Sequence, residues 1–360
     1  MTIYLLGAFL FSIACGAYFT PLVIDYCKRK KLYDMPDGRK VHQSAVPRLG
    51  GITFFPSMMV AFAGALVLIS FNEPDSLKIN IWSAGYLVGL AIMFCTGFID
   101  DISGLKAPAK FAAQTVAAVL LPMTGLYVNN LYGLFGIYEI PYAVGILLTI
   151  FIIVFICNAI NLIDGIDGLA ASVSLIALGG YLAYFIAYGV FSLTYTLLIA
   201  GMMGVLLVFL CYNLFGSTER STKIFMGDSG SLSLGYTLGF LAIKCAADIE
   251  WIWPYRPEAL LVPLTLLFVP AADVVRVTLY RMFHGKPLFI ADKNHIHHKL
   301  MRCGLSQHQT LIFIIGYTLM VCALNAMLYP TLSATFVLLI DIATFIAVDI
   351  LTNLNTKTAE

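Results

Sequence analysis

Charged residues are scarce in this chain. They make up only 11% of its 360 residues, whereas soluble domains carry about 25%. Hydrophobic residues account for 60% of the chain, and its mean hydropathy is +0.89. These values exclude an ordinary soluble protein, and we expect an all-α polytopic integral membrane protein. The net charge of +1 identifies no partner, and no nucleic acid is expected as one.

Several features that would indicate other classes of protein are missing. The eight cysteines are scattered and no Cys-x-x-Cys pair occurs, so neither a disulfide framework nor a zinc site is indicated. The chain shows no internal repeat, no appended soluble domain and no cleavable signal peptide. We therefore expect one transmembrane domain over residues 1–360, with its motifs between about residues 34 and 304.

Long apolar stretches recur along the chain. A helix needs about 20 apolar residues to cross a hydrocarbon core of about 30 Å. The fourth and eighth stretches that meet this criterion are interrupted by Lys110 and Lys244. The eleven predicted spans lie roughly at 3–27, 50–71, 81–99, 109–126, 141–159, 169–188, 193–215, 231–247, 259–283, 310–329 and 332–351.

Basic residues gather on one side of these spans. Lysines and arginines follow spans one, three, seven and nine, whereas the opposite loops hold only Lys78 and Arg256. Cytoplasmic loops are rich in Lys and Arg, so the N-terminus should lie outside and the C-terminus in the cytoplasm. The polar motifs fall on the same cytoplasmic side. This favours chemistry at that surface over transport, which requires opening to both sides.

The most informative stretch is Asn158-Ala-Ile-Asn161-Leu-Ile-Asp164-Gly-Ile-Asp167-Gly-Leu169, between two apolar runs. Residues three apart are neighbours on a helix, so Asn158, Asn161 and Asp164 can share one face. The glycines that follow allow a turn that brings Asp167 back toward them. Four oxygen-bearing side chains at one point suit Mg²⁺ or the donor groups of a sugar or base. The alternative is a solvated loop between two spans.

Two further acidic motifs stand at membrane boundaries. The adjacent carboxylates of Asp100 and Asp101 repel each other, so we expect a cation or donor to compensate them. A helix cap would account for one of the pair. The motif Gly-Asp-Ser-Gly-Ser at 227–231 directly precedes span eight, whose N-terminal end attracts anions. Asp228 is a candidate metal ligand, and either serine alternatively serves as a helix cap.

Two basic segments complete the set. The loop 33–51 is shaped by prolines and glycines, and its basic residues either meet phosphates or form an ordinary positive-inside loop. Three histidines, His295, His297 and His298, fall within four residues. Their spacing is compatible with a transition metal, but their basic neighbours favour contact with phosphate. The sequence assigns no role to Asp273, and we interpret Asp349 as non-catalytic.

Together these motifs resemble those of the polyprenyl-phosphate N-acetylhexosamine-1-phosphate transferases, the glycosyltransferase 4 family. The resemblance implies ten or eleven membrane helices, bound Mg²⁺, and transfer of a sugar 1-phosphate from a UDP-sugar to a lipid phosphate with release of UMP. The element His42-x-x-x-x-Pro47-x-x-Gly50-Gly51 is similar to that of the WecA/TagO-like branch, which makes GlcNAc-diphosphate-undecaprenol. The resemblance is carried by Asp100-Asp101-x-x-Gly104-Leu105, Asn158-x-x-Asn161-x-x-Asp164-Gly-x-Asp167-Gly-Leu169, Gly227-Asp228-x-Gly-Ser231 and His295-x-His297-His298.

The resemblance also implies roles for single residues. Asn161 and Asp228 would hold Mg²⁺, for which Mn²⁺ could substitute, and Phe225 would stack on uracil. Asn158 and Lys110 are further candidates for binding the donor. The candidate catalytic residues are Asp100 and Asp101 near the attacking lipid phosphate, Asp164 and Asp167 in the nucleoside pocket, and His295, His297 and His298 as diphosphate contacts.

Some alternatives stay open. The sugar could be GlcNAc, GalNAc, a deoxy-aminosugar or the MurNAc-pentapeptide of the peptidoglycan branch, and a lipid or nucleotide transporter is the rival class. Asp100 could orient the lipid phosphate, act as a base or act as a nucleophile. The segment from Asn213 to Phe225 is longer than is common in the family, which leaves the role of Asn213 open. The expected location is the bacterial cytoplasmic membrane, as a monomer or a homodimer, with the active site on the cytoplasmic face.

Overall fold

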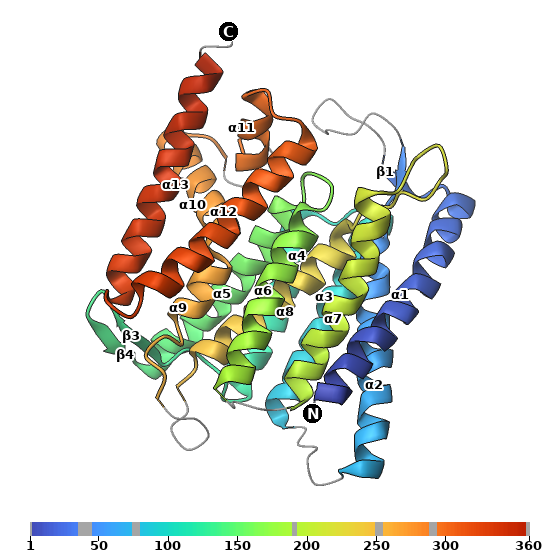
Figure 1. The fold of residues 1–360 in the computed structure, drawn as a ribbon, viewed down its shortest axis with the longest axis horizontal. Helices are drawn as coiled ribbons and strands as arrows, with labels where there is room; N and C mark the ends of the chain where they lie inside the picture. Colours follow the sequence, from blue (N-terminus) through green and yellow to red (C-terminus); the bar gives the residue numbers. More distant parts are fainter. Residues whose placement is uncertain are drawn as a thin grey trace.

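The computed structural model describes residues 2–34, 45–73, 80–188, 193–248, 255–287 and 294–357, and helices dominate them. Two antiparallel hairpins, β1–β2 and β3–β4, join helices at the two ends (Figure 1). The predicted all-α fold is confirmed. The elements are α1 (Thr2–Lys30), β1 (Tyr33–Asp34), β2 (Val46–Pro47), η1 (Gly50–Thr53), α2 (Phe54–Asn72), α3 (Ile81–Ser103), α4 (Ala107–Met123), β3 (Asn130–Leu134), β4 (Ile137–Glu139), α5 (Tyr142–Ile163), α6 (Leu169–Ala187), α7 (Leu193–Leu214), α8 (Gly227–Ala246), α9 (Leu261–Leu266), α10 (Phe268–Phe283), α11 (Ile296–Arg302), α12 (Gln307–Leu328) and α13 (Ala334–Lys357).

The membrane-spanning helices agree with the predicted polytopic arrangement. In the described part of the chain, eight helical segments are long and apolar enough to cross a membrane: α1, η1 with α2, α3, α5, α6, α7, α12 and α13. The other three predicted spans coincide with α4, with α8 and with the pair α9–α10. The two termini lie at opposite ends of the molecule (Figure 1), the arrangement that the eleven predicted spans imply.

The ninth predicted span is broken rather than continuous. α9 ends at Leu266 and α10 begins at Phe268. Pro270 has no N–H group to donate to the carbonyl of Leu266 four residues earlier, which accounts for the break at this point. Two short helices therefore replace one long one, and α10 carries its own polar residues toward the end where β1 and α11 lie (Figure 1).

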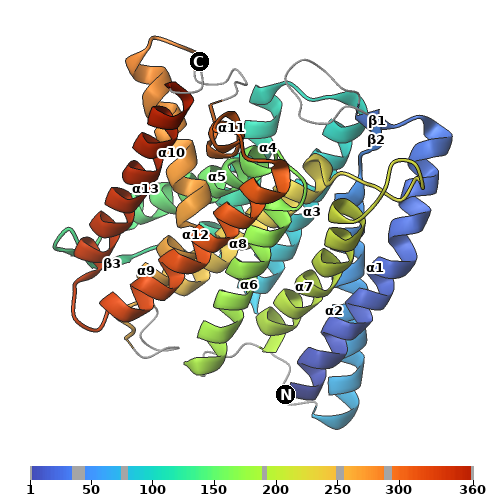
Figure 2. The same cartoon turned by 45° about the horizontal axis from the view of Figure 1, so that its top comes forward.

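Helix α8 lies at the centre of the bundle, packed against α3 and α5 (Figure 2). Every residue from Ser229 to Ala246 is buried. Because protein rather than lipid surrounds it, α8 tolerates Lys244 and a run of small residues. Its glycines allow close approach: a Cβ on Gly235 would lie 2.6 Å from Cα of Cys157 on α5. The N-terminus of this central helix carries Asp228.

Candidate active site

The acidic motifs converge on one cavity of about 380 Å³ at the end of the molecule that carries β1 and α11. α3, α5 and α8 deliver them there, because α3 and α5 end where α8 begins. The turn after α5 and the strand-like segment before α8 supply the rest of the wall. The lining includes six aspartates, Asp34, Asp100, Asp101, Asp164, Asp167 and Asp228, together with Arg48, Asn161, Asn213, Phe225, His298 and Gln307.

Lys110 joins two of the predicted motifs. Its Nζ lies 2.9 Å from Oδ2 of Asp100 and 2.6 Å from Oδ2 of Asp228. The other oxygen of Asp228 accepts a hydrogen bond of 3.0 Å from Nδ2 of Asn161, which also donates to Oγ of Ser231. Residues predicted from three separate motifs are thus in direct contact. The compensating cation expected beside the acid pair is Lys110, at the start of α4.

Asp101, the second acid of the pair, caps the central helix. Its carboxylate accepts hydrogen bonds from the backbone N–H groups of Asp228 at 2.8 Å and Ser229 at 2.9 Å. Gly227 has a φ of +75°, and a Cβ there would lie 2.7 Å from both oxygens of Asp101. A negative side chain at a helix N-terminus is favourable. The helix-cap interpretation therefore describes Asp101, whereas Asp100 faces Lys110.

The turn after α5 brings two further aspartates into the cavity. Asp164 directly follows α5. Gly168 turns the chain with a φ of +74°, and its N–H donates to Oδ1 of Asn213 at 2.6 Å. Asp167 pairs with Lys223 at 2.6 Å. Burial, together with the nearby carboxylate of Asp228, raises the pKa of Asp164 to about 8. The carboxylates are therefore crowded enough to repel one another.

The first basic loop reaches the cavity through backbone contacts. Phe225 donates its N–H to the carbonyl of Pro47 at 2.8 Å, and its own carbonyl accepts from the N–H of Gly50 at 2.8 Å. A Cβ on Gly51 would lie 2.1 Å from the backbone of Gly230, so only glycine fits there. These contacts place Arg48 and Phe225 on the cavity wall. His42 lies outside the described residues.

The structure places the three motif histidines in three different settings. His298 lines the cavity. His297 is buried against Gly165, where a Cβ would lie 2.2 Å from its Nε2, and burial lowers its pKa to about 3. Neither ring nitrogen of His297 has a hydrogen-bond partner in the described part of the structure. His295 is turned away, with Nδ1 2.8 Å from Oδ2 of Asp273.

Asn158 differs from the predicted arrangement. It lies one turn before Asn161, and its Nδ2 donates to Oε1 of Gln114 and to the carbonyl of Val154, both at 2.7 Å. The described residues that line the cavity do not include it. The spacing correctly placed it on the same helix, but its side chain pairs with α4 instead of facing the acids. Three of the four oxygen-bearing side chains of this motif line the cavity.

The donor set fits a hard divalent cation. Among the described residues, no three His, Cys, Asp or Glu side chains form a ready-made metal site. Mg²⁺, however, is usually held by one or two carboxylates together with substrate phosphates. Asp228 supplies a carboxylate and Asn161 an amide group in contact with it, among aspartates that outnumber the cations paired with them.

Comparison with known proteins agrees with the motifs. The family model described as "Glycosyl transferase family 4" matches residues 83–246. A probable undecaprenyl-phosphate N-acetylglucosaminyl 1-phosphate transferase of Bacillus subtilis is 32% identical over 348 residues, which is 92% of this chain and 88% of that protein. The chain belongs to glycosyl transferase family 4. The resemblance drawn from its motifs is confirmed.

Other members of the family give similar coverage. A decaprenyl-phosphate N-acetylglucosaminephosphotransferase of Mycobacterium tuberculosis is 34% identical over 78% of this chain and 71% of that protein. An undecaprenyl-phosphate alpha-N-acetylglucosaminyl 1-phosphate transferase of Yersinia pestis is 29% identical over 87% of this chain and 80% of that protein. The likeness therefore extends well beyond the four motifs.

Some residues of this family 4 site were not individually predicted. Lys223 belongs to the basic loop after the seventh predicted span, and it pairs with Asp167. Asn213 joins two loops through Gly168 and the carbonyl of Ile224, so the longer segment that follows it still returns to the site. Gln307 lines the cavity from the start of α12. A single polar residue at a helix start gives no sequence signal that distinguishes it from others.

Proposed function

We propose that this chain transfers N-acetylglucosamine 1-phosphate from UDP-N-acetylglucosamine to undecaprenyl phosphate and releases UMP. The observation that carries the proposal is the cavity in which six aspartates meet Lys110, Arg48 and Asn161 at one end of a membrane bundle. Such a surplus of carboxylates suits a metal-bound diphosphate. The names of the relatives from Bacillus subtilis and Yersinia pestis support both the lipid acceptor and the sugar.

The reaction requires little acid–base catalysis. The second pKa of a phosphate monoester is near 6, so the lipid phosphate is mostly ionised at neutral pH. One of its oxygens attacks the phosphorus that carries the sugar. The bond from that phosphorus to the bridging oxygen breaks, and UMP leaves with this oxygen. The barrier is the approach of two anions, and Lys110 and Arg48 lower it by placing positive charge beside the reacting groups.

Asp228 and Asn161 would hold Mg²⁺ in this proposal. The ion supplies charge neutralisation for the donor diphosphate when bound. Asp164, Asp167 and Phe225 line the part of the cavity proposed for the nucleoside, and the ring of Phe225 offers a stacking surface. Asp100 contacts Lys110, and in this proposal it orients the lipid phosphate. Direct attack is proposed over a covalent intermediate on Asp100.

The proposed orientation places the cavity at the cytoplasmic face. The last turn of α1 contains Lys28, Arg29 and Lys30, and the site lysines Lys110 and Lys223 belong to the same end. Positive charge is typical of cytoplasmic ends. A cysteine introduced at Ser103 should react with a membrane-impermeant reagent only from the cytoplasmic side. Labelling from outside intact cells would contradict this orientation.

The function is tested by incubating the purified protein with undecaprenyl phosphate and a panel of UDP-sugars, and measuring UMP release. We expect UDP-GlcNAc to be the best donor. Preference for UDP-MurNAc-pentapeptide would instead support the peptidoglycan reaction. Movement of lipid or nucleotide across a proteoliposome membrane without UMP release would support a transporter.

The attack mechanism has its own test. If Asp100 formed a covalent intermediate, enzyme and UDP-sugar without lipid would exchange labelled UMP into the donor. We expect no exchange in lipid-stripped native protein. Exchange that is present in the native protein and absent in Asp100→Asn would establish the covalent route.

A further inference from the structure

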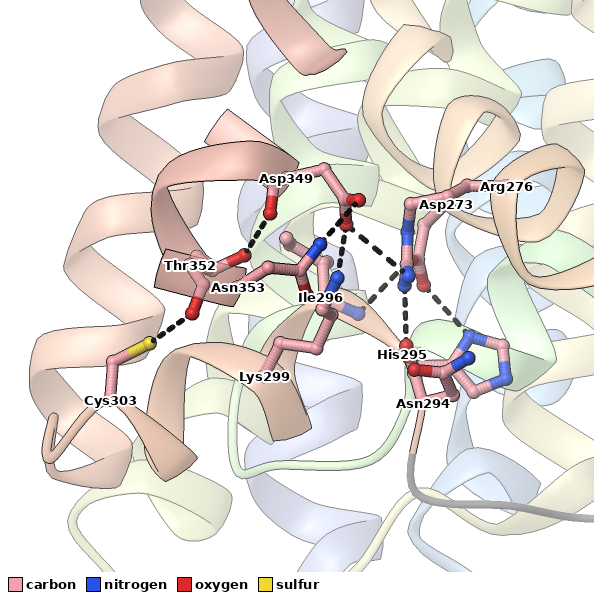
Figure 3. Close-up of polar contacts among 10 residues, drawn as sticks. All are labelled: Asp273, Arg276, Asn294, His295, Ile296, Lys299, Cys303, Asp349, Thr352 and Asn353. Atoms are coloured by element: carbon pink, nitrogen blue, oxygen red, sulfur yellow. Dashed lines mark hydrogen bonds and ion pairs between the residues drawn. The ribbon is translucent and has the colours of Figure 1, made fainter. Parts of the chain in front are cut away.

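A second polar cluster lies beside the cavity and includes two acids to which the sequence assigned no catalytic role. Asp273 on α10 is 1% exposed, and Asp349 belongs to α13 (Figure 3). Asp273 accepts from Nδ1 of His295 at 2.8 Å and from the backbone N–H of Ile296 at 2.9 Å. Burying an unpaired charge is costly. The donors around Asp273 offset this cost and hold its carboxylate in one position.

Arg276 links the two acids. Its guanidinium lies 2.8 Å from Oδ1 of Asp273 and 3.4 Å from Oδ1 of Asp349, and it donates to the backbone carbonyl of Asn294 (Figure 3). Asp349 also pairs with Lys299 on α11. One network therefore runs from α10 through Arg276 to α13 and back to α11.

The network holds α11 in place, a helix too short to be stable without tertiary contacts. α11 has seven residues, and isolated helices shorter than about 12 residues are marginal in water. Asp273 fixes its first residues through His295 and Ile296. Asp349 fixes its second turn through Lys299, and Cys303 at its C-terminal end donates Sγ–H to the carbonyl of Thr352 on α13 at 3.3 Å.

The position of α11 determines part of the cavity wall. His298 lines the cavity, and His297 fills the space directly beside Gly165 in the turn that carries Asp164 and Asp167. A rotation or shift of α11 would move His298 and loosen that turn together. Misplacement by about 1 Å is enough to lower a rate substantially.

We propose that Asp273 is a positioning residue that acts through His295 to fix α11, so that His298 faces the cavity, and that Arg276 and Asp349 complete this anchor. His295 serves as the partner of Asp273 and does not contact substrate. The effect on turnover rests on the proposed transferase function, whereas the effect on the seating of α11 does not.

His295 variants separate positioning from direct contact. The amide nitrogen of Asn lies near the place of Nδ1 in His, whereas that of Gln lies near Nε2. We therefore expect His295→Asn to keep the bond to Asp273 and retain activity within about threefold, and His295→Gln to lose about tenfold or more in kcat/KM. A direct diphosphate contact would have to be made through Nε2, because Nδ1 faces Asp273. His295→Asn would then lose at least as much activity as His295→Gln, which would overturn the proposal.

Coupling to His298 gives a second measurement. We expect Asp273→Asn to lower kcat/KM by about 30-fold in the native background but by less than about threefold in a His298→Ala background. A general effect on the fold would lower activity equally in both. Asp349→Asn changes a less buried position, and its effect on kcat/KM should likewise depend on His298. It replaces Asp273→Asn if that variant fails to accumulate. Asp25→Asn, at an exposed ion pair on α1, is the matched control.

The closing experiment does not depend on activity. Cys303 is followed by thiol labelling and peptide mass spectrometry in the purified full-length protein. Because Cys303 bonds to α13 only while α11 is seated, we expect slow labelling in native protein and His295→Asn, and labelling about fivefold faster in His295→Gln and Asp349→Asn. Equal labelling in all four overturns the proposal. If the native protein were inactive but showed this labelling pattern, the proposed function would be contradicted and the proposed anchoring of α11 would still be supported.

Discussion

Two clusters of charged side chains lie at the same end of this molecule, and they differ in charge balance. In the cavity, six aspartates meet four basic side chains among the described residues, Arg48, Lys110, Lys223 and His298. In the cluster around α11, two aspartates meet Arg276, Lys299 and His295 (Figure 3). The first cluster carries surplus negative charge, whereas each acid of the second has a basic partner.

The difference in charge balance indicates that the cavity is a binding site and that the α11 cluster is a structural support for it. Crowded carboxylates raise one another's pKa and destabilise the site that holds them, so they are retained where a cation or substrate completes the set. Matched charges fix neighbouring elements in place without needing a ligand. We therefore infer that the cavity binds a metal-bound diphosphate and that the α11 cluster shapes one wall of it.

The largest expected effect comes from removing divalent cations. Without a cation, the surplus carboxylates repel a donor diphosphate. UMP release should fall to background in excess chelator and return when Mg²⁺, or Mn²⁺ in its place, is added in excess of the chelator. Full turnover in chelator would contradict this distinction between the clusters, because the surplus negative charge of the cavity would then need no metal.

Acid-to-amide changes in the two clusters should differ strongly. We expect Asp228→Asn to lower kcat by about 10³, which corresponds to about 4 kcal/mol. Asp349→Asn removes a similar charge from the matched cluster and should cost about tenfold or less. The measurement is UMP release at saturating donor and lipid. Equal losses in the two variants would show that charge balance does not distinguish the clusters.

Tightly packed backbone beneath the cavity should tolerate an added side chain less well than helix surfaces elsewhere. A Cβ on Gly51 would overlap the backbone of Gly230 at 2.1 Å, whereas a Cβ on Gly7 meets nothing within 4 Å. Gly51→Ala should lower the free energy of unfolding by about 3 kcal/mol, and Gly7→Ala should leave it unchanged or slightly raised. Thermal unfolding in detergent measures both. Similar unfolding temperatures for the two variants would mean that α8 and η1 separate easily.

The smallest expected effect is at the edge of the cavity. Lys223 pairs with Asp167, and both side chains are about one-fifth exposed. Partly exposed ion pairs contribute about 1 kcal/mol or less, so Lys223→Met should raise the donor KM by about threefold to fivefold with little change in kcat. Lys28→Met, at the exposed pair with Asp25, is the control. A change in kcat of Lys223→Met without a change in KM would place Lys223 nearer the reacting atoms than the cavity suggests.

The spans and the meeting of the acidic motifs could be predicted from the sequence. Hydropathy identifies helices because the bilayer sets their length, and the one-sided placement of the motifs brought Asp100, Asp164 and Asp228 to one end. The adjacent pair Asp100–Asp101 predicted a compensating partner, and the structure supplies Lys110 for one acid and a helix N-terminus for the other.

Side-chain pairing across helices could not be predicted in the same way. Asn158 has the spacing of a site residue but finds Gln114 on α4. His295 belongs to the histidine motif but finds Asp273, which lies 22 positions earlier on another helix. Helical periodicity fixes which residues share a face, and it contains no information about which neighbouring helix that face meets. The burial of α8 depends on the same missing information.

The most direct test of the account is the binding of Mn²⁺, followed by its electron paramagnetic resonance signal, to purified protein with UDP-N-acetylglucosamine. Native protein and Asp349→Asn should both bind the ion with similar affinity, and Asp228→Asn should bind it at least about tenfold more weakly. This outcome would assign the metal to the cluster with surplus charge. Native-like binding by Asp228→Asn, or equal loss of binding in both variants, would contradict the account.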